Sequence, residues 1–146
     1  MAFAVTLEDY RRDQRTRSVA DALLALEHSL WAEGWPAVEA HMCADSLLGR
    51  ERDGEEALGL SAFVRDRSPS PFKAVRLTPL RCTTAGRTAV LHYVAVLKHE
   101  SFRNPKLGSC MSVYRQDATK AAGWCLLSNH FATLTPKRMR AILGDA

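Results

Sequence analysis

Apolar residues in the first third of the chain recur at helical spacing. Between residues 18 and 33 they fall three or four positions apart, which predicts a helix with one buried face. Residues 6–17 are predicted to form a preceding helix or an extension of the same one. Gly34 ends this segment, and Pro36 suits the first turn of a short second helix that runs to about Ala44.

The pattern changes to alternation in the second half of the chain. A third helix is predicted over 55–65 after a short strand at Leu47 and Leu48, and the SPSP segment then breaks the chain. Four antiparallel strands are expected over 73–82, 87–99, 108–116 and 123–134, followed by a helical turn or two between Pro136 and Leu143. Helices followed by strands predict an α+β fold with helices packed on one face of a curved sheet.

The strand over 87–99 is apolar on both faces. One face carries Val90, His92, Val94 and Val96, and the other carries residues such as Leu91 and Tyr93. Both faces must therefore be covered. Helices can cover one, and a homodimer through the outer sheet face is predicted to cover the other, because a bare apolar patch of this size is avoided on monomers.

Composition and charge narrow the class of protein. The 146 residues suit one domain, and no apolar run is long enough for a membrane span. The charged start does not resemble a signal peptide, so a cytoplasmic protein is predicted. The four cysteines are widely spaced, which indicates small buried side chains in a reducing compartment, with neither a structural metal nor a cofactor.

Basic residues are concentrated near both ends of the chain, and the net charge is +4. The N-terminal cluster of Arg11, Arg12, Arg15 and Arg17 is mixed with acidic residues and lacks interleaved aromatics. This pattern favours a solvated helix face over a nucleic-acid surface.

Three stretches carry a resemblance to a known superfamily. They are ALEHSLWAEGWPAVEAHMCADSLL, VRLTPLRCTTAGRTAVLHYVAVL and SVYRQDATKAAGWCLLSNHFATLTP. Together they resemble the nuclear transport factor 2-like superfamily, which includes ketosteroid isomerase and SnoaL-like proteins, and most closely its domain of unknown function 4440 family. The resemblance implies a cone-shaped (cystatin-like) antiparallel sheet with N-terminal helices on its concave face, over residues 18–136. Residues 1–17 are then an N-terminal helical extension and 137–146 a C-terminal tail.

Alignment with ketosteroid isomerase implies places for three functional groups. Glu51 falls where the isomerase has its general-base carboxylate, and Glu27 where it has an oxyanion-stabilising tyrosine. The position of the protonated acid falls on Met111 or on its neighbour Ser112. Because two of these three positions differ, steroid isomerisation is disfavoured.

The resemblance also implies a pocket between the helices and the sheet. On the strand over 87–99 the pocket face is predicted to be that of Val90, His92, Val94 and Val96, with Tyr93, and Tyr114 of the next strand, turned towards a dimer partner. On the last strand it is predicted to include Leu127, Asn129 and Phe131, with Leu126 and His130 turned towards the partner. A strand phase wrong by one would exchange the two sets. The predicted pocket-lining residues are Glu27, Trp31, Phe63, Val90, Val94, Val96, Met111, Leu127, Asn129 and Phe131.

Several residues of this pocket each have two possible roles. Asn129 either contacts a ligand or holds the sheet to a helix end. His92 and Glu51 either form a proton-transfer pair or are a core histidine and a solvated carboxylate. Likewise, Trp31 is either an apolar pocket floor or part of the core.

The functional expectation is a homodimeric protein that binds a small hydrophobic molecule. The alternative is an isomerase, cyclase, dehydratase or hydrolase acting through His92 and Glu51. A third and weaker possibility is an interaction module that works through its dimer surface or basic N-terminus.

Overall fold

The computed structural model describes residues 7–46, 70–101 and 103–144, and all structural statements below concern these residues. The predicted short strand at Leu47 and Leu48 and the predicted helix over 55–65 lie outside them. Helices come first, a sheet follows, and a last helix ends the order of elements: α1 (Leu7–Glu33), α2 (Trp35–His41), β1 (Phe72–Ala85), β2 (Thr88–His99), β3 (Lys106–Gln116), β4 (Trp124–Thr133) and α4 (Pro136–Leu143).

Helix α1 is a single element of 27 residues, so the two predicted N-terminal segments are one helix. It ends at Gly34, whose φ of 90° favours glycine because a side chain would be strained there. Leu23, Leu26 and Leu30 are buried on the face that packs against the sheet. The boundary predicted at residue 17 stays a prediction, although the helix passes through it without a break.

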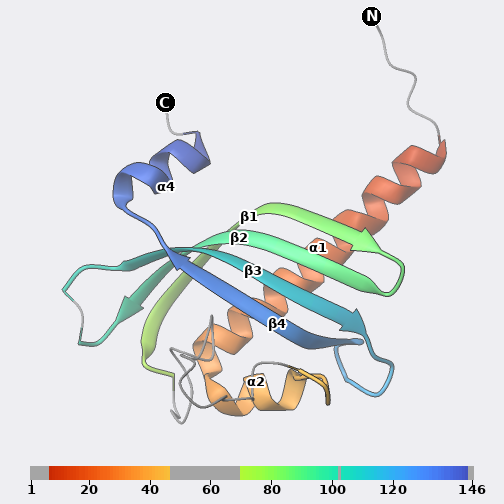
Figure 1. The fold of residues 1–146 in the computed structure, drawn as a ribbon, viewed down its shortest axis with the longest axis horizontal. Helices are drawn as coiled ribbons and strands as arrows, with labels where there is room; N and C mark the ends of the chain where they lie inside the picture. The colour runs from red at the N-terminus through yellow and green to blue at the C-terminus, as the bar shows by residue number, and fades with distance from the viewer. Residues whose placement is uncertain (1–6, 47–69, 102, 145–146) are drawn as a thin grey trace, which may run out of the picture.

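The four strands form one antiparallel sheet in the order β1-β2-β3-β4. The sheet is strongly curled, and α1 crosses one of its faces (Figure 1). The turn between β1 and β2 uses Gly86 with a positive φ of 59°, as the predicted TAGR turn requires. The predicted α+β fold with a curved sheet is therefore confirmed.

The hydrophobic core lies between α1 and the inner face of the sheet. The inward residues of β2 from Ala89 to Leu97 are fully buried, namely Ala89, Leu91, Tyr93, Ala95 and Leu97. The phase predicted for this strand was wrong, because these residues were assigned to the dimer surface. Alternation turns Val90, His92, Val94 and Val96 to the outer face.

An irregularity in β4 also exchanges part of its predicted faces. Val113 pairs with Ser128 but Tyr114 pairs with Leu126, which leaves Leu127 as an extra residue between them. Leu126 consequently faces the core and is fully buried, contrary to the prediction, whereas Asn129 keeps its predicted inward direction.

A disulfide joins the end of α2 to the start of β4. Cys43 is bonded to Cys125, and the adjacent backbone of Cys43 donates a hydrogen bond to the carbonyl of Leu126. The prediction of four reduced cysteines was wrong for this pair, and Cys82 and Cys110 are free. Wide spacing in sequence concealed the pair, because only folding brings β4 beside α2. The predicted cytoplasmic location stays a prediction, and disulfides are more typical of oxidising compartments.

Helix α4 follows the last strand and lies on the outer side of the sheet (Figure 1). Thr135 caps its first turn by accepting a hydrogen bond from the backbone of Arg138, and Gly144 ends it in the left-handed conformation. Met139 is its buried residue. Among the helices described, none has the length and apolar character needed to cross a membrane.

Candidate functional site

Among the described residues, Glu27 on α1 is the one acidic residue that is buried, and its side chain is completely shielded from solvent. Tyr93 and Ser112 each donate a hydroxyl hydrogen bond to Glu27 Oε1 at 2.5 Å. The amide of Asn129 donates to the same oxygen at 3.0 Å, and the Tyr114 hydroxyl donates to Oε2. We call these five residues the Glu27 cluster.

Further contacts fix the orientation of the donors. The indole Nε1 of Trp31 donates to the Tyr93 hydroxyl at 2.9 Å, so that the Tyr93 hydroxyl can direct its own hydrogen at Glu27. The Asn129 amide also donates to Ser112 Oγ at 2.5 Å. The carboxyl group is thus surrounded by a connected set of side chains.

Strand register explains why these groups meet. Ser112 and Tyr114 are two residues apart on β3 and share its inner face, and Ser112 lies directly opposite Asn129 on β4. Tyr93 reaches the same region from β2. On α1, Glu27 and Trp31 are four residues apart and present one face to the sheet.

Burial dominates the electrostatics of the cluster. It raises the pKa of Glu27 above its usual value, and hydrogen bonds from Ser112, Tyr114 and the other donors oppose that rise. The pKa values of Tyr93 and Tyr114 lie well above 10, first because of burial and then because of the Glu27 charge. The tyrosines therefore remain protonated hydrogen-bond donors, and burial favours the neutral acid form of Glu27.

Four of the predicted pocket residues lie on the same side of the sheet as α1. Glu27 and Asn129 belong to the Glu27 cluster, and Trp31 donates to Tyr93. Phe131 packs edge-on against Trp31 with ring centroids 5.9 Å apart. The Asn129 amide joins β4 to α1 through Glu27, and its contact with a ligand stays a prediction.

The residues predicted from the exchanged phase of β2 lie on the other side. His92 is half-buried on the outer face, where its Nε2 is 2.8 Å from Ser109 Oγ, and Met111 pairs with it and is 43% exposed. The Met111 assignment was therefore wrong, and its neighbour Ser112 is the inward residue. Val90, also on the outer face, is half-buried.

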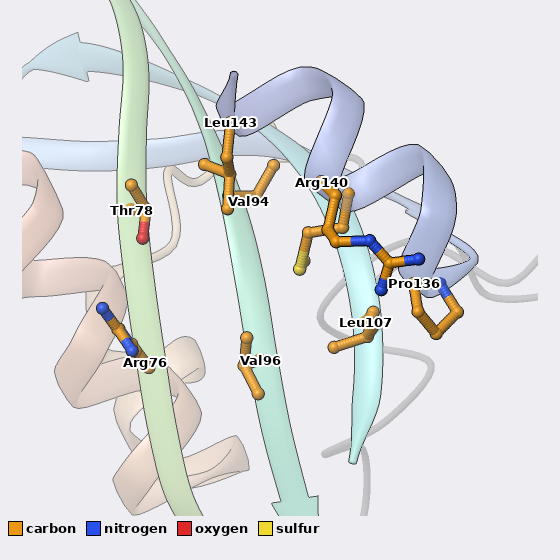
Figure 2. A pocket seen from close by; sticks show the side chains of 9 residues that line it. Arg76, Thr78, Val94, Val96, Leu107, Pro136, Arg140 and Leu143 are labelled. Atoms are coloured by element: carbon orange, nitrogen blue, oxygen red, sulfur yellow. The ribbon is translucent and has the colours of Figure 1, made fainter. Parts of the chain in front are cut away.

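Val94 and Val96 line a cavity, but it lies between the outer sheet face and α4 rather than beside α1 (Figure 2). Leu127 is half-buried at the irregularity in β4. The two remaining predicted residues, Glu51 and Phe63, lie outside the described part of the chain. Within the described part, no group of three or more potential metal ligands occurs.

Sequence reasoning missed most donors of the Glu27 cluster. Tyr93 and Tyr114 were assigned to a dimer surface, and Ser112 was only an alternative to Met111. A signal was present: Ser112 and Tyr114 share a strand face two residues apart, and the predicted β3–β4 pairing brings a polar asparagine opposite them.

Comparisons with known proteins identify the fold. The chain matches no protein-family model and no curated protein. Among solved structures it resembles a putative ketosteroid isomerase from Parabacteroides distasonis, with a TM-score of 0.55, 19% identity and coverage of 79% of this chain and 87% of that one. It also resembles the S. rosetta CaMKII hub, with a TM-score of 0.55, 21% identity and coverage of 79% and 96%.

These likenesses establish a fold of the nuclear transport factor 2-like type. At such identities they carry no information about activity. The closer relationship to the domain of unknown function 4440 family stays a prediction.

Proposed function

We propose that this protein binds a small, largely apolar molecule in the interior between α1 and the inner sheet face, with the Glu27 cluster as its polar contact. One observation carries the proposal: side chains from three strands direct hydrogen bonds at a single carboxyl group that is fully buried. A putative ketosteroid isomerase is among the solved structures that share the fold, which is consistent with the binding of a small molecule.

The buried carboxyl group of Glu27 is costly for a core that serves packing alone. Burying a carboxyl group costs several kcal/mol before its hydrogen bonds offset the loss, and well-packed apolar residues in its place are often neutral or stabilising. A polar centre at this depth therefore favours a role in recognition over a role in packing alone. The donors can redirect towards a ligand oxygen, because three of the four are rotatable hydroxyls.

The surroundings indicate the class of molecule. The cluster lies among apolar residues such as Leu91, Leu126 and Phe131. An anion would be repelled when Glu27 is charged, and a cation would have no other carboxyl group in the described interior. We therefore favour a neutral ligand with one hydroxyl or carbonyl group, which Glu27 or Tyr114 can pair with.

We also propose a homodimer through the part of the outer sheet face that α4 leaves uncovered. Met111 is exposed there, and Val90 and Val113 pair beside it. The resemblance to a CaMKII hub supports assembly as a property of this fold. Because the phase of β2 is exchanged, this surface differs from the one that the sequence suggested.

A second candidate function is proton transfer at the same site. The raised pKa of Glu27 favours it, because a carboxyl group whose acid form is stabilised by burial retains a proton that it can give to a bound substrate. The catalytic roles of His92 and Glu51 stay predictions. His92 would have to act on the outer face, so a His92→Ala variant that retains any measured turnover contradicts its role.

The binding proposal is tested by native mass spectrometry. Wild-type protein is incubated with 2-naphthol and 1-indanone, which are neutral, mostly apolar molecules carrying one hydroxyl or one ketone, and complexes are counted. We expect one molecule bound in each subunit, and about tenfold weaker binding in Glu27→Gln because the carboxyl group is its main polar partner.

A matched variant controls for loss of a carboxylate elsewhere on the same helix. Asp21→Asn removes an exposed acid of α1 and should bind both probes as the wild type does. Equal binding by Glu27→Gln and the wild type, or binding of neither probe by the wild type, would contradict the proposal.

A further inference from the structure

A cavity of about 320 Å³ lies on the outer side of the sheet beneath α4. Its floor is formed by Val94 and Val96 of β2 and Leu107 of β3 (Figure 2). Met139 of α4 also lines it. Val94 and Met139 are buried, Val96 and Leu107 are half-buried, and Leu143 is 45% exposed, so the cavity has a buried base and an opening to solvent. The volume is at the lower end of the range for small-molecule sites.

The cavity lies between the sheet and α4, and its lining comes from segments that are far apart in the sequence. Val96 and Leu107 are register partners on adjacent strands. Helix α4 begins at Pro136, soon after β4 ends at Thr133, and lies on the outer side of the sheet (Figure 1). A molecule in the cavity would contact the sheet on one side and the helix on the other.

The charged residues around the cavity are all of one sign. Arg76 from β1 and Arg140 from α4 lie on opposite sides of it, with Val96 between them (Figure 2). None of the described residues that line the cavity is acidic. Among the described residues the ion pairs are Lys73–Glu100 and Arg115–Asp45, so neither lining arginine is neutralised by one of them.

From this arrangement we infer that the cavity beneath α4 binds a free single-chain amphiphile with a carboxylate head group, such as a medium-chain fatty acid. The apolar floor receives the chain, which gains free energy in proportion to the apolar area removed from water. Arg140 or Arg76 pairs with the carboxylate, because a guanidinium can donate two parallel hydrogen bonds to it. Thr78, on the same edge as Arg76, offers a further hydroxyl.

This site is separate from the interior site proposed above. The two lie on opposite faces of the sheet, since Tyr93 contacts Glu27 while the adjacent Val94 lines the outer cavity. It is also separate from the proposed dimer surface, because Met111 lies near the middle of β3 and Leu107 near its start. Each proposal can therefore fail without the other.

The test is isothermal titration calorimetry of the full chain with decanoate, below the concentration at which decanoate forms micelles. We expect one binding site per chain. Decanol, which lacks the charge, and decyltrimethylammonium, which reverses it, should bind at least about tenfold more weakly, as the loss of a charged hydrogen bond implies.

Variants locate the bound molecule. Arg140→Gln should weaken decanoate binding about tenfold, and adding Arg76→Gln should weaken it further. Arg138→Gln, which removes an exposed arginine from the same helix but outside the cavity, should leave it unchanged. In an NMR titration, decanoate should shift the methyl resonance of Met139 and leave the side-chain amide of Asn129 in place.

Three outcomes would overturn the inference. They are absence of decanoate binding, equal binding of decanol and decanoate, and equal loss of affinity in Arg138→Gln and Arg140→Gln. Phosphatidylglycerol vesicles distinguish a membrane surface from a free ligand. If the protein binds these vesicles but not monomeric decanoate, the basic face attaches to a bilayer and the cavity is not a fatty-acid site.

Discussion

Glu27 combines two properties that normally oppose each other in a protein interior. It is fully buried, which favours the neutral acid, and it accepts four hydrogen bonds, which favour the carboxylate. Because burial is the larger influence, its pKa is raised. A small change in the surroundings, such as a bound ligand, can then change its protonation.

The raised pKa predicts how stability depends on pH. Between the unfolded value of 4.5 and the higher folded value, the native state holds a proton that the unfolded chain has released. The free energy of unfolding therefore falls as pH rises through this window, by at most about 1.4 kcal/mol for each pH unit from this one group. Urea unfolding of the wild type and Glu27→Gln between pH 4 and 8 measures the difference.

Glu27→Gln removes this titration while keeping the side-chain shape, so its stability should fall less with pH than that of the wild type. A difference between the two proteins that does not change with pH would mean that Glu27 titrates as it does in the unfolded chain. The exposed-acid variant Asp21→Asn should follow the wild-type curve.

At this scale the sequence predicted some participants but not their arrangement. Glu27 and Asn129 were identified through the family resemblance, and the structure joins them by a hydrogen bond. Tyr93 was assigned to the wrong face because both faces of β2 are apolar, so its pattern contains no signal that selects the inner one. Only the position of α1 decides it.

Strands β3 and β4 show how packing between elements sets local sequence requirements. Gly108 is buried on β3, and the ring of Phe131 from β4 occupies the space where a side chain would begin. A Cβ at residue 108 would lie 2.0 Å from the ring, much closer than van der Waals contact allows. Phe131 in turn packs against Trp31, so its freedom to move away is limited.

Gly108→Ala should consequently destabilise the protein by about 1–3 kcal/mol, the usual cost of overpacking. The double variant Gly108→Ala with Phe131→Leu should recover part of the loss, because the smaller side chain vacates the space. Chemical denaturation of both variants and of Phe131→Leu alone gives the coupling. An unchanged stability in Gly108→Ala would show that the Phe131 ring can turn aside freely.

The disulfide is the other constraint between elements, and it joins residues 82 positions apart. Removing it with Cys43→Ala should lower the free energy of unfolding by about 2–5 kcal/mol, as for other native disulfides. Dithiothreitol should have a similar effect on the wild type and none on Cys43→Ala. Cys82→Ala, which removes a free thiol, is the control.

Thiol counting by mass spectrometry after alkylation in denaturant gives an independent reading. The wild type should show two reactive thiols without reductant and four with it. Four thiols in the unreduced protein would contradict the bond and return all four cysteines to the role first predicted for them.

For the whole molecule, the sequence predicted the order of helices and strands and the curled antiparallel sheet. This succeeded because hydrophobic periodicity and turn residues are local signals. The position of α4, the disulfide and the irregularity in β4 depend on contacts between distant segments, for which the sequence holds no local signal. They are also the features that determine which residues face the interior and which line the cavity beneath α4.

The oligomeric state is a property of the whole molecule. We expect a dimer by native mass spectrometry, held in part by the exposed side chain of Met111 on the outer face. Met111→Lys should shift the protein to monomers at low micromolar concentration, because charge at the centre of an apolar interface is costly. Ala121→Lys, in the exposed loop before β4, should not. A wild-type monomer at all concentrations would remove the dimer proposal.

In the proposed function, a small molecule enters the interior and contacts the Glu27 cluster. Two-dimensional ¹H–¹⁵N NMR tests it most directly, because the Asn129 side-chain amide and the Trp31 indole both belong to the hydrogen-bonded set around Glu27. Titration with 2-naphthol should shift these two resonances and leave the exposed backbone amides of α4 in place. If the probe binds while both resonances stay unmoved, the ligand lies elsewhere and the Glu27 cluster is a structural core.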